Sequence, residues 1–359
     1  MKPLEPLALP PMNLKELADV LGLSQTTVSR ALNGYPEVRE STRQRVVRTA
    51  ELHNYRPNIR AMGLATGKAM TIGHIIPMYF KNEVVNPVFG EFIAGASQTY
   101  QANGYELLLT MAEDQNEEET YRNIVAKGSV DGVIVHSPRT NDFRVALLKE
   151  MELPFVIHGR VNESTLDYCW VDVNNRHAFQ RATQLLIDLG HQRIALVNGP
   201  EILNFAWLRR QGYLEAMSCA ARVIDDALMT SAELSEANGY RAAQAMLAHA
   251  DPPTAFLVSS YVAALGIRRA VSQAGLVMGE DVSVIIHDDE LSFFHNSDAF
   301  PQFTATQSSV KLAGMRAAEM LLKLIDNPQL SPMNELLEAN LTLGASTGPL
   351  KQKPASRSS

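Results

Sequence analysis

The run SQTTVSRALN, residues 24–33, brings together side chains that can read nucleic-acid bases. An arginine can form two hydrogen bonds to guanine, and a glutamine can do the same with adenine. At helical spacing Val28 and Leu32 share one face, which leaves Gln25 and Arg30 on the opposite, outer face. The run therefore predicts a helix that can enter a DNA groove, although a solvated helix in a small bundle would show the same pattern.

The residues around this run predict the element that positions it. Residues 13–55 have the apolar spacing of three short helices, and Asn13 with Glu16 has the spacing of a capping box. Gly22 and Leu23 interrupt the chain between the first and second helices. Two short helices joined by a tight, glycine-containing turn are typical of a helix-turn-helix, whose second helix lies in the major groove.

The charge distribution separates a small head from a larger body. Residues 1–70 hold ten Lys and Arg against six Asp and Glu, a balance of +4, whereas the rest hold 22 against 33, a balance of −11. A basic head favours contact with a polyanion.

No apolar run approaches the roughly 20 residues that cross a bilayer, and no N-terminal secretory signal is evident. The sequence has only two cysteines, which is too few for a disulfide framework. We therefore expect a cytoplasmic protein without membrane contact.

From residue 71 onward, short β-rich apolar runs alternate with segments of helix length. This alternation predicts buried parallel strands, and their grouping predicts an α/β body of two lobes with doubly wound parallel sheets. Ligands of such folds bind at the carboxyl ends of the strands. The predicted strands cover residues 71–78, 105–112, 131–137, 154–159, 169–173, 193–199, 255–260 and 282–289.

Longer motifs resemble the LacI/GalR family of bacterial transcriptional regulators. In the head they are TVSRALN, the V-x-x-x-T-R-x-x-V pattern of the third helix, and NYRPN. In the body they are NPVFGEFIAGA, DGVIVHSP, LGHQRIALVNGP, LRRQGYLEAM and VSVIIHDDE. The resemblance extends to about residue 348. Within the family, the sequence is similar to regulators of α-glucoside utilisation. It implies a homodimer whose body, like periplasmic sugar-binding receptors, closes two lobes on a small ligand.

The resemblance also implies the domain boundaries. They are a disordered N-terminus (1–12), the DNA-binding domain (13–57), a hinge helix and linker (58–69), the effector-binding and dimerisation domain (70–348) and a flexible tail (349–359). Within the body, the first lobe would comprise 70–168 and 303–335, and the second 169–302 and 336–348.

Carried over residue by residue, the resemblance implies DNA contacts in the head and hinge. Bases would be read by Gln25, Thr26 and Arg30, and the DNA backbone would be held by Ser24, Thr27, Ser29, Asn33 and Tyr55. The hinge helix would carry Asn58, Ala61 and Leu64. In the family this helix lies in the minor groove, where the paired leucines of a dimer separate a base step. Because Gly63 weakens an isolated helix, we expect the hinge to fold only with DNA; a plain flexible linker is the alternative.

An effector site between the lobes is implied in the same way. Arg209 and Asp288 match the family's ligand-binding arginine and acid, and Phe89 matches an aromatic that lies against the ligand. Taken alone, Arg209 could form a surface salt bridge, Asp288 could cap a helix, and Phe89 could belong to the core. Asp289 is the better candidate for a cap. Further candidate contacts at or after strand ends are His136, Arg160 and Trp170, whereas His158 is expected to be structural.

Two positions depart from many sugar-responsive relatives. Ser260-Tyr261 stands where Asn-Asp is common, and Gly159-Arg160 stands where an acid is common. The small residues Ser260 and Gly159 predict room for a disaccharide or glycoside, with an α-glucoside favoured. The alternative is a purine or another small metabolite that recruits the protein to DNA.

Other classes of protein are disfavoured. Residues 63–68, GLATGK, have three residues between the glycines rather than the four of a phosphate loop. Asp288 and Asp289 are neighbours on a predicted strand and should point to opposite faces, unlike a glycosidase pair. The sequence contains no nucleophile elbow, metal-ligand spacing or dinucleotide fingerprint, so we expect no enzyme, no cofactor and no metal. A transport receptor would not need the basic head.

Together, the helix-turn-helix and the family resemblance predict a repressor that is released from a palindromic operator when a sugar binds.

Overall fold

The computed structural model describes residues 12–32, 34–55, 67–79, 86–162, 167–296 and 300–351. The chain divides into two compact units, Met1–Ala69 and Met70–Ser359. The predicted hinge contacts Asn58, Ala61 and Leu64 lie outside the described residues, as do Asn33 and most of the two predicted disordered ends.

The first unit contains the three predicted helices, α1 (Leu14–Leu21), α2 (Gln25–Leu32) and α3 (Glu40–Leu52). The predicted capping box is present, because the Asn13 side chain accepts the Glu16 N–H and the Glu16 carboxylate accepts the Asn13 N–H. Gly22 ends α1 in the left-handed region, with a φ of 65°, where glycine is favoured. The fully buried side chains of the small core are Leu17, Val28 and Val46, one from each helix.

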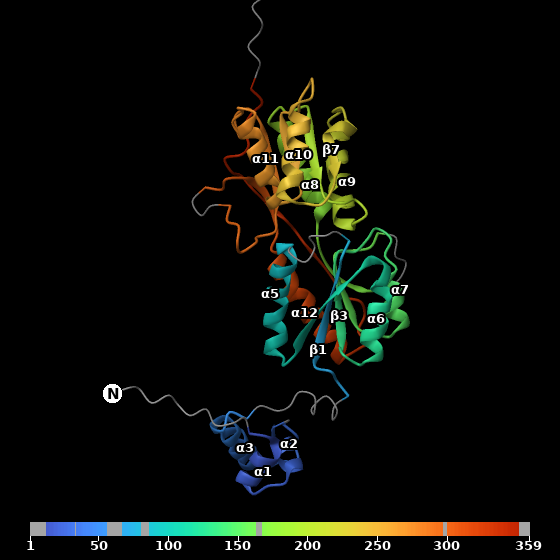
Figure 1. The fold of residues 1–359 in the computed structure, drawn as a ribbon, viewed down its shortest axis with the longest axis vertical. Coiled ribbons are helices and arrows are strands. Elements are labelled where there is room, and N and C mark those ends of the chain that lie inside the picture. The colour runs from blue at the N-terminus through green and yellow to red at the C-terminus, as the bar shows by residue number, and fades with distance from the viewer. Residues whose placement is uncertain are drawn as a thin grey trace, which may run out of the picture. The chain divides into compact units, whose positions relative to one another are not determined.

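The second unit is built on two six-stranded sheets (Figure 1). The first has the order β11-β5-β4-β3-β1-β2 and is parallel throughout. Its strands are β1 (Thr71–Pro77), β2 (Glu106–Ala112), β3 (Gly132–Val135), β4 (Phe155–His158), β5 (Cys169–Val173) and β11 (Asn334–Leu337). The helices around it are α5 (Pro87–Ala102), α6 (Glu117–Ala126), α7 (Arg144–Glu150) and α12 (Val310–Asp326), with the 3-10 turn Asp114–Asn116 before α6.

The second sheet has the order β12-β10-β9-β8-β6-β7, and only β12 runs antiparallel to its neighbour. Its strands are β6 (Ile194–Asn198), β7 (Met229–Ser231), β8 (Ala255–Val258), β9 (Ser283–Asp288), β10 (Thr304–Gln307) and β12 (Asn340–Thr342). Its helices are α8 (Asn175–Asp188), α9 (Asn204–Cys219), α10 (Glu236–Leu247) and α11 (Tyr261–Gln273), with the 3-10 turn Asp226–Leu228 before β7.

Alternate strand residues pack under helices on opposite faces of each sheet. In the first sheet, Ile72 and Ile134 pack with α5 and α12, whereas Ile75 and Val133 pack with α6 and α7. In the second sheet the two faces are covered by α8 with α9 and by α10 with α11. Burial on both sides explains the continuous apolar runs of the inner strands, such as β1, β3, β8 and β9.

The sheets correct the predicted lobe boundaries. Strand β5 pairs with β4 and β11, so residues 169–173 belong to the first lobe rather than the second. Strand β10 pairs with β9, so residues 304–307 belong to the second lobe rather than the first. The chain crosses between lobes just after β5, β10 and β11. The first two crossings come one strand later than the resemblance implied, and the third comes at the end of β11 rather than within it. Among the helices that the structure describes, none combines the length and apolar character that a bilayer span requires.

Candidate functional site

Helix α2 presents the three predicted base-reading side chains to solvent. Gln25, Thr26 and Arg30 are exposed, while Val28 and Ala31 face the core of the head. The face turned outward is therefore the polar one, as the helical spacing indicated.

The predicted backbone contacts of the head have mixed surroundings. The Ser24 hydroxyl accepts the Thr27 N–H at 3.1 Å and lies 2.8 Å from the Thr27 hydroxyl, so it caps α2. Ser29 is half-buried, and Tyr55 packs against the apolar core, where burial raises its pKa. Ser24, through its cap, and Tyr55, through its packing, thus stabilise the head, whatever contact they make with DNA.

Other arginines of the head have structural partners. Arg43 donates to Glu40 and to the Tyr35 carbonyl, at 2.9 Å in each case. Arg45 donates to the Leu21 carbonyl at 3.1 Å and so ties α3 to the end of α1. Among the described residues Arg30 has no such side-chain partner, which leaves its guanidinium available to an external acceptor.

A cavity of about 380 Å³ lies between the carboxyl ends of the two sheets. Cavities that bind small molecules typically measure roughly 300–1,000 Å³ and have mostly apolar walls with a few polar groups. One wall here is apolar and includes Val88 and Phe89 at the start of α5 and Leu203 and Phe205 at the start of α9. Phe89 therefore lies where it was predicted.

Arg209 forms the centre of the polar wall, as predicted. It is only 5% exposed, its Nε donates to Asn175 Oδ1 at 2.8 Å, and its Nη1 donates to the Ser259 carbonyl at 2.7 Å. The ring of Phe205 lies 4.9 Å from the guanidinium carbon. Burial lowers the pKa of Arg209 to about 10, so the group stays charged at neutral pH. In the described part of the chain no partner is bonded to Nη2, which can therefore serve a ligand.

Close packing of α9 against α8 positions Arg209. A Cβ on Gly212 would lie 2.0 Å from the Arg176 carbonyl oxygen, so only glycine permits this approach. Gly212 follows Arg209 by one helical turn on the face that meets α8, which brings the arginine within reach of Asn175.

The acid in the cavity is Asp289 rather than Asp288, which corrects the sequence prediction. Asp288 Oδ1 accepts the Glu290 N–H at 2.9 Å, and its Oδ2 accepts Gln307 at 3.3 Å, so its carboxylate holds the turn after β9 and ties it to β10. Asp289 lines the cavity, 3.4 Å from His287. Burial opposes ionisation of Asp289, but His287 and Arg209 bring its pKa below the usual value. An ionised carboxylate therefore faces the cavity beside the guanidinium.

Three other predicted contacts do not line the cavity. His136 is wholly buried and lies 3.1 Å from His74. Arg160 binds Asp172 at 2.7 Å, and its guanidinium carbon lies 5.2 Å from the Trp170 ring, which packs with the α6 and α7 side of the sheet. His136 and Arg160 follow strand ends but turn away from the cavity, whereas Trp170 lies near the start of β5, away from the end that meets the cavity.

Several cavity residues were missed by the sequence analysis. His158 was expected to be structural but lines the cavity, and its ring stacks on Phe92 at 4.3 Å. Asp172 and Asn175 also line it, and Asn175 Nδ2 lies 3.4 Å from Asp172 Oδ1. Burial raises the pKa of Asp172, although its bond to Arg160 opposes that rise. Asp172 stands inside an apolar strand run, so nothing in the pattern marked it as a site residue.

The predicted spare room is present at only one of the two small residues. Ser260 lines the cavity and accepts the Val262 N–H at 3.1 Å, which caps α11. At Gly159 a Cβ would lie 2.7 Å from Pro138 Cγ, and the backbone φ is 112°. Pro138 thus fills the space that the missing side chain leaves, and the backbone conformation itself favours glycine.

Main-chain hydrogen bonds join the lobes beside the cavity. The Asn204 N–H donates to the Pro138 carbonyl at 2.9 Å, and the Thr140 N–H donates to the Ile202 carbonyl at 3.1 Å. Between them, Arg139 and Leu203 form an antiparallel bridge. We call residues 138–140 and 202–204 the interlobe clasp. With this clasp formed, Pro138 and Leu203 contribute to the cavity wall.

A head with a helix-turn-helix and a two-lobed body with a cavity between its sheets define a ligand-responsive DNA-binding regulator. Comparison with known proteins gives the family. Residues 13–58 match the model for bacterial regulatory proteins of the lacI family, and residues 70–341 match that for periplasmic binding proteins and the sugar-binding domain of the LacI family. The chain belongs to the LacI family and is a DNA-binding transcriptional repressor.

Individual relatives agree with this assignment. The HTH-type transcriptional regulator AglR of Rhizobium meliloti (strain 1021) is 45% identical over 339 residues, which cover 94% of this chain and 95% of the relative. The HTH-type transcriptional regulator RafR of Escherichia coli is 31% identical over 88% of this chain and 92% of its own length.

Solved structures support the fold. A complex of the transcriptional regulator CelR with cellobiose has a TM-score of 0.69 and 26% identity, covering 93% of this chain and 99% of its own. A lac repressor dimer bound to operator and an anti-inducer has a TM-score of 0.80 at 24% identity, covering 94% of this chain and 99% of its own.

Proposed function

We propose that this protein represses a carbohydrate-utilisation operon and is released from a palindromic operator when a glycoside, with an α-glucoside favoured, binds the cavity. The observation that carries this proposal is that the charged residues Arg209 and Asp289 and the aromatic residues Phe89 and Phe205 line the same cavity. The charged groups can bond sugar hydroxyls, while the aromatic rings suit the C–H faces of a sugar.

The relatives point in the same direction. CelR is described in complex with cellobiose, a disaccharide, and the sequence resembles regulators of α-glucoside utilisation. The cavity of about 380 Å³ falls in the size range of small-molecule sites. A small glycoside therefore fits the chemistry and the dimensions of the site.

For the DNA-binding side we propose that two heads of a homodimer read the two halves of the operator in the cytoplasm. Gln25, Thr26 and Arg30 would read base edges, while Ser24, Thr27, Ser29, Asn33 and Tyr55 would hold phosphates and Asn58, Ala61 and Leu64 would occupy the minor groove. Because binding of sugar and of DNA is coupled through one protein, the coupling must be reciprocal: operator DNA weakens sugar binding by the same factor.

Two measurements test the proposal. Isothermal titration calorimetry of the full-length protein against α- and β-glucosides, galactosides, monosaccharides, purines and nucleosides identifies the class of effector. Gel-shift titration on DNA upstream of the protein's own gene, with and without each binder, gives the direction of the response. We expect an α-glucoside to bind and to release the DNA. Binding of a purine alone, together with tighter DNA binding, would replace this proposal with ligand-recruited repression.

A further inference from the structure

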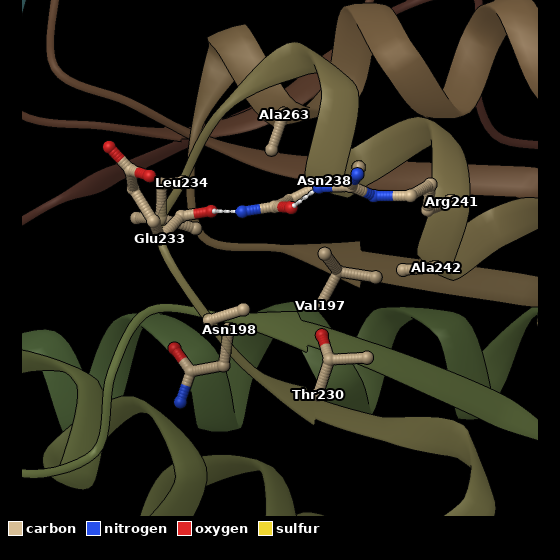
Figure 2. A pocket seen from close by; sticks show the side chains of 11 residues that line it. Val197, Asn198, Thr230, Glu233, Leu234, Asn238, Arg241, Ala242 and Ala263 are labelled. Atoms are coloured by element: carbon tan, nitrogen blue, oxygen red, sulfur yellow. Dashed lines mark hydrogen bonds between the residues drawn. The ribbon is translucent and has the colours of Figure 1, made fainter. Parts of the chain in front are cut away.

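A second cavity of about 250 Å³ lies in the second lobe, beneath the start of α10. Its walls combine the apolar side chains Val197, Ala242 and Ala263 with the polar residues Thr230, Asn238 and Arg241 (Figure 2). In this view Glu233 and Leu234 stand at one end and Arg241 at the other. The surface of this cavity is mainly apolar, with amide, hydroxyl and guanidinium groups at its edge.

The two cavities share one piece of wall. Glu233 and Leu234 line both of them, and Ser235, the next residue, lines the effector cavity alone. These residues form the loop between β7 and α10. The second cavity therefore lies directly behind one end of the effector cavity.

The shared loop is held firmly in place. The Ala232 N–H donates to the Asn198 carbonyl at 3.2 Å, and the Asn238 side chain donates to the Glu233 carbonyl at 2.8 Å. The Arg241 guanidinium in turn donates to Asn238. On the other side of Leu234, the Ser235 hydroxyl accepts the Asn238 N–H at 3.2 Å. Because these bonds fix the loop on both sides of Leu234, the side chain of Leu234 is the part of the wall that a substitution can remove.

The side chain of Leu234 also reaches the aromatic end of the effector cavity. A Cβ on Gly199 would lie 3.0 Å from Phe205 Cζ and 3.4 Å from Leu234 Cδ1, so both side chains converge on this glycine. Phe205 is the ring that lies against Arg209. Leu234 thus closes the effector cavity close to the group that we assign to bind the sugar.

We propose that Leu234 is a specificity-determining residue that limits the length of the glycoside effector, and that the second cavity is an extension of the effector site from which this side chain separates it. This inference rests on the proposed function. A smaller side chain at position 234 joins the two spaces and admits one further sugar unit, whose hydroxyls would meet Asn238, Thr230 and Arg241.

The test is the variant Leu234→Ala in the full-length protein, titrated by calorimetry with maltose, maltotriose and maltotetraose. We expect the wild-type protein to bind maltose at least tenfold more tightly than maltotriose, and Leu234→Ala to reduce or reverse that ratio by at least tenfold. An unchanged ratio in a folded variant overturns the inference. The matched control is Leu265→Ala, which removes the same atoms from the same apolar cluster but from a residue that lines neither cavity. It should lower the unfolding temperature while leaving the length ratio unchanged.

A second variant separates this effect from general loosening. Ala242→Leu refills the second cavity, so the double variant Leu234→Ala, Ala242→Leu should regain the wild-type length ratio; a double variant that keeps the new preference overturns the inference. If the wild-type protein binds none of the three glucosides, the proposed function fails instead. The crystal structure of Leu234→Ala then decides the inference alone, since one continuous cavity supports it and two separate cavities refute it.

Discussion

The recognition helix and the effector cavity use polar side chains in opposite surroundings. In α2, Gln25, Thr26 and Arg30 are exposed, and the fold does not depend on them. In the cavity, Arg209 and Asp172 are almost fully buried and bonded to other protein groups. An exposed reader can therefore be changed alone, whereas a change in the cavity wall disturbs a network. The two regions should respond differently to the same kind of substitution.

The largest effect is expected for Arg209→Met. This change leaves Asn175 Oδ1 and the Ser259 carbonyl without their donor and removes the cation from the cavity. Breaking a buried, bonded charge typically costs about 3–5 kcal/mol, so calorimetry should show sugar affinity reduced by more than a hundredfold. Operator affinity without sugar should stay within about threefold of wild type, because the head is untouched.

Arg210→Met is the matched control for that variant. Arg210 is the next residue of α9, but it pairs with Glu201 at 2.7 Å and is one-third exposed. Exposed pairs contribute roughly 0–1 kcal/mol, so sugar affinity should change little. An equal loss of sugar affinity in Arg209→Met and Arg210→Met would contradict the assignment of Arg209 to the ligand site.

The next largest effect is expected for the free energy of unfolding when the pH is lowered, because the first lobe buries histidines in their neutral form. Burial lowers the pKa of His74 to about 3, whereas an unfolded histidine titrates near 6.5. Between these values only the unfolded chain takes up the proton, so stability is complete above pH 6.5 and falls as the pH drops toward 3. The loss at pH 5 relative to pH 7 should be about 2 kcal/mol for this histidine.

The measurement is thermal unfolding of the body between pH 7.5 and 5. Buried His136, whose pKa is also lowered by burial, should add to the decrease. The net charge is −7 at pH 7 and approaches zero near the pI of about 5.8, so charge repulsion weakens between these pH values and cannot produce the same loss of stability. An unfolding temperature that stays constant or rises toward pH 5 would contradict the burial of neutral histidines.

Arg30→Ala tests the exposed residues of α2, which we propose to read bases. Loss of a base contact typically costs about 1–3 kcal/mol and relaxes base choice at one position in each half-site. Gel-shift titrations on operators varied at each position should show both effects, with sugar affinity unchanged. Arg45→Ala is the control, since this arginine holds the Leu21 carbonyl and should weaken all sequences equally. Unaltered operator preference in Arg30→Ala would exclude the groove assignment.

The smallest effect is expected for Ser24→Ala, which removes the cap of α2. Loss of such a cap typically costs about 1 kcal/mol, and Asn preserves it. Hydrogen exchange in the full-length protein should therefore show faster exchange at the start of α2 in Ser24→Ala than in Ser24→Asn. Identical rates in the two variants would mean that the hydroxyl bond to Thr27 contributes nothing to the helix.

The sequence predicted those parts of the fold that depend on local pattern. All eight predicted strands are present: seven have mainly buried apolar runs, whereas β2 lies at the edge of its sheet and keeps Leu109 and Met111 exposed. The three head helices follow from spacing and caps. The strands β7, β10, β11 and β12 were not predicted, since they are short and largely polar, and their pairing depends on chain segments far away.

The cavity was less predictable than the head. Arg209 and Phe89 were identified through family resemblance, but Asp288 and Asp289 were exchanged because a turn after β9 reverses which carboxylate meets the cavity. Asp172 and Asn175 act where the chain crosses between lobes, and only the three-dimensional pairing of strands reveals that position. Binding residues on the exposed face of one helix can be predicted from their spacing in the sequence. Binding residues at the ends of strands that are far apart in the sequence cannot.

The interlobe clasp has an evolutionary consequence. Its two hydrogen bonds join main-chain atoms of residues 138–140 and 202–204, so substitutions that keep the backbone path leave them intact. Side chains around the cavity can then diverge toward new ligands while the contact between the lobes is kept. Descendants of one ancestral gene can therefore acquire different ligands and inherit the same main-chain contact.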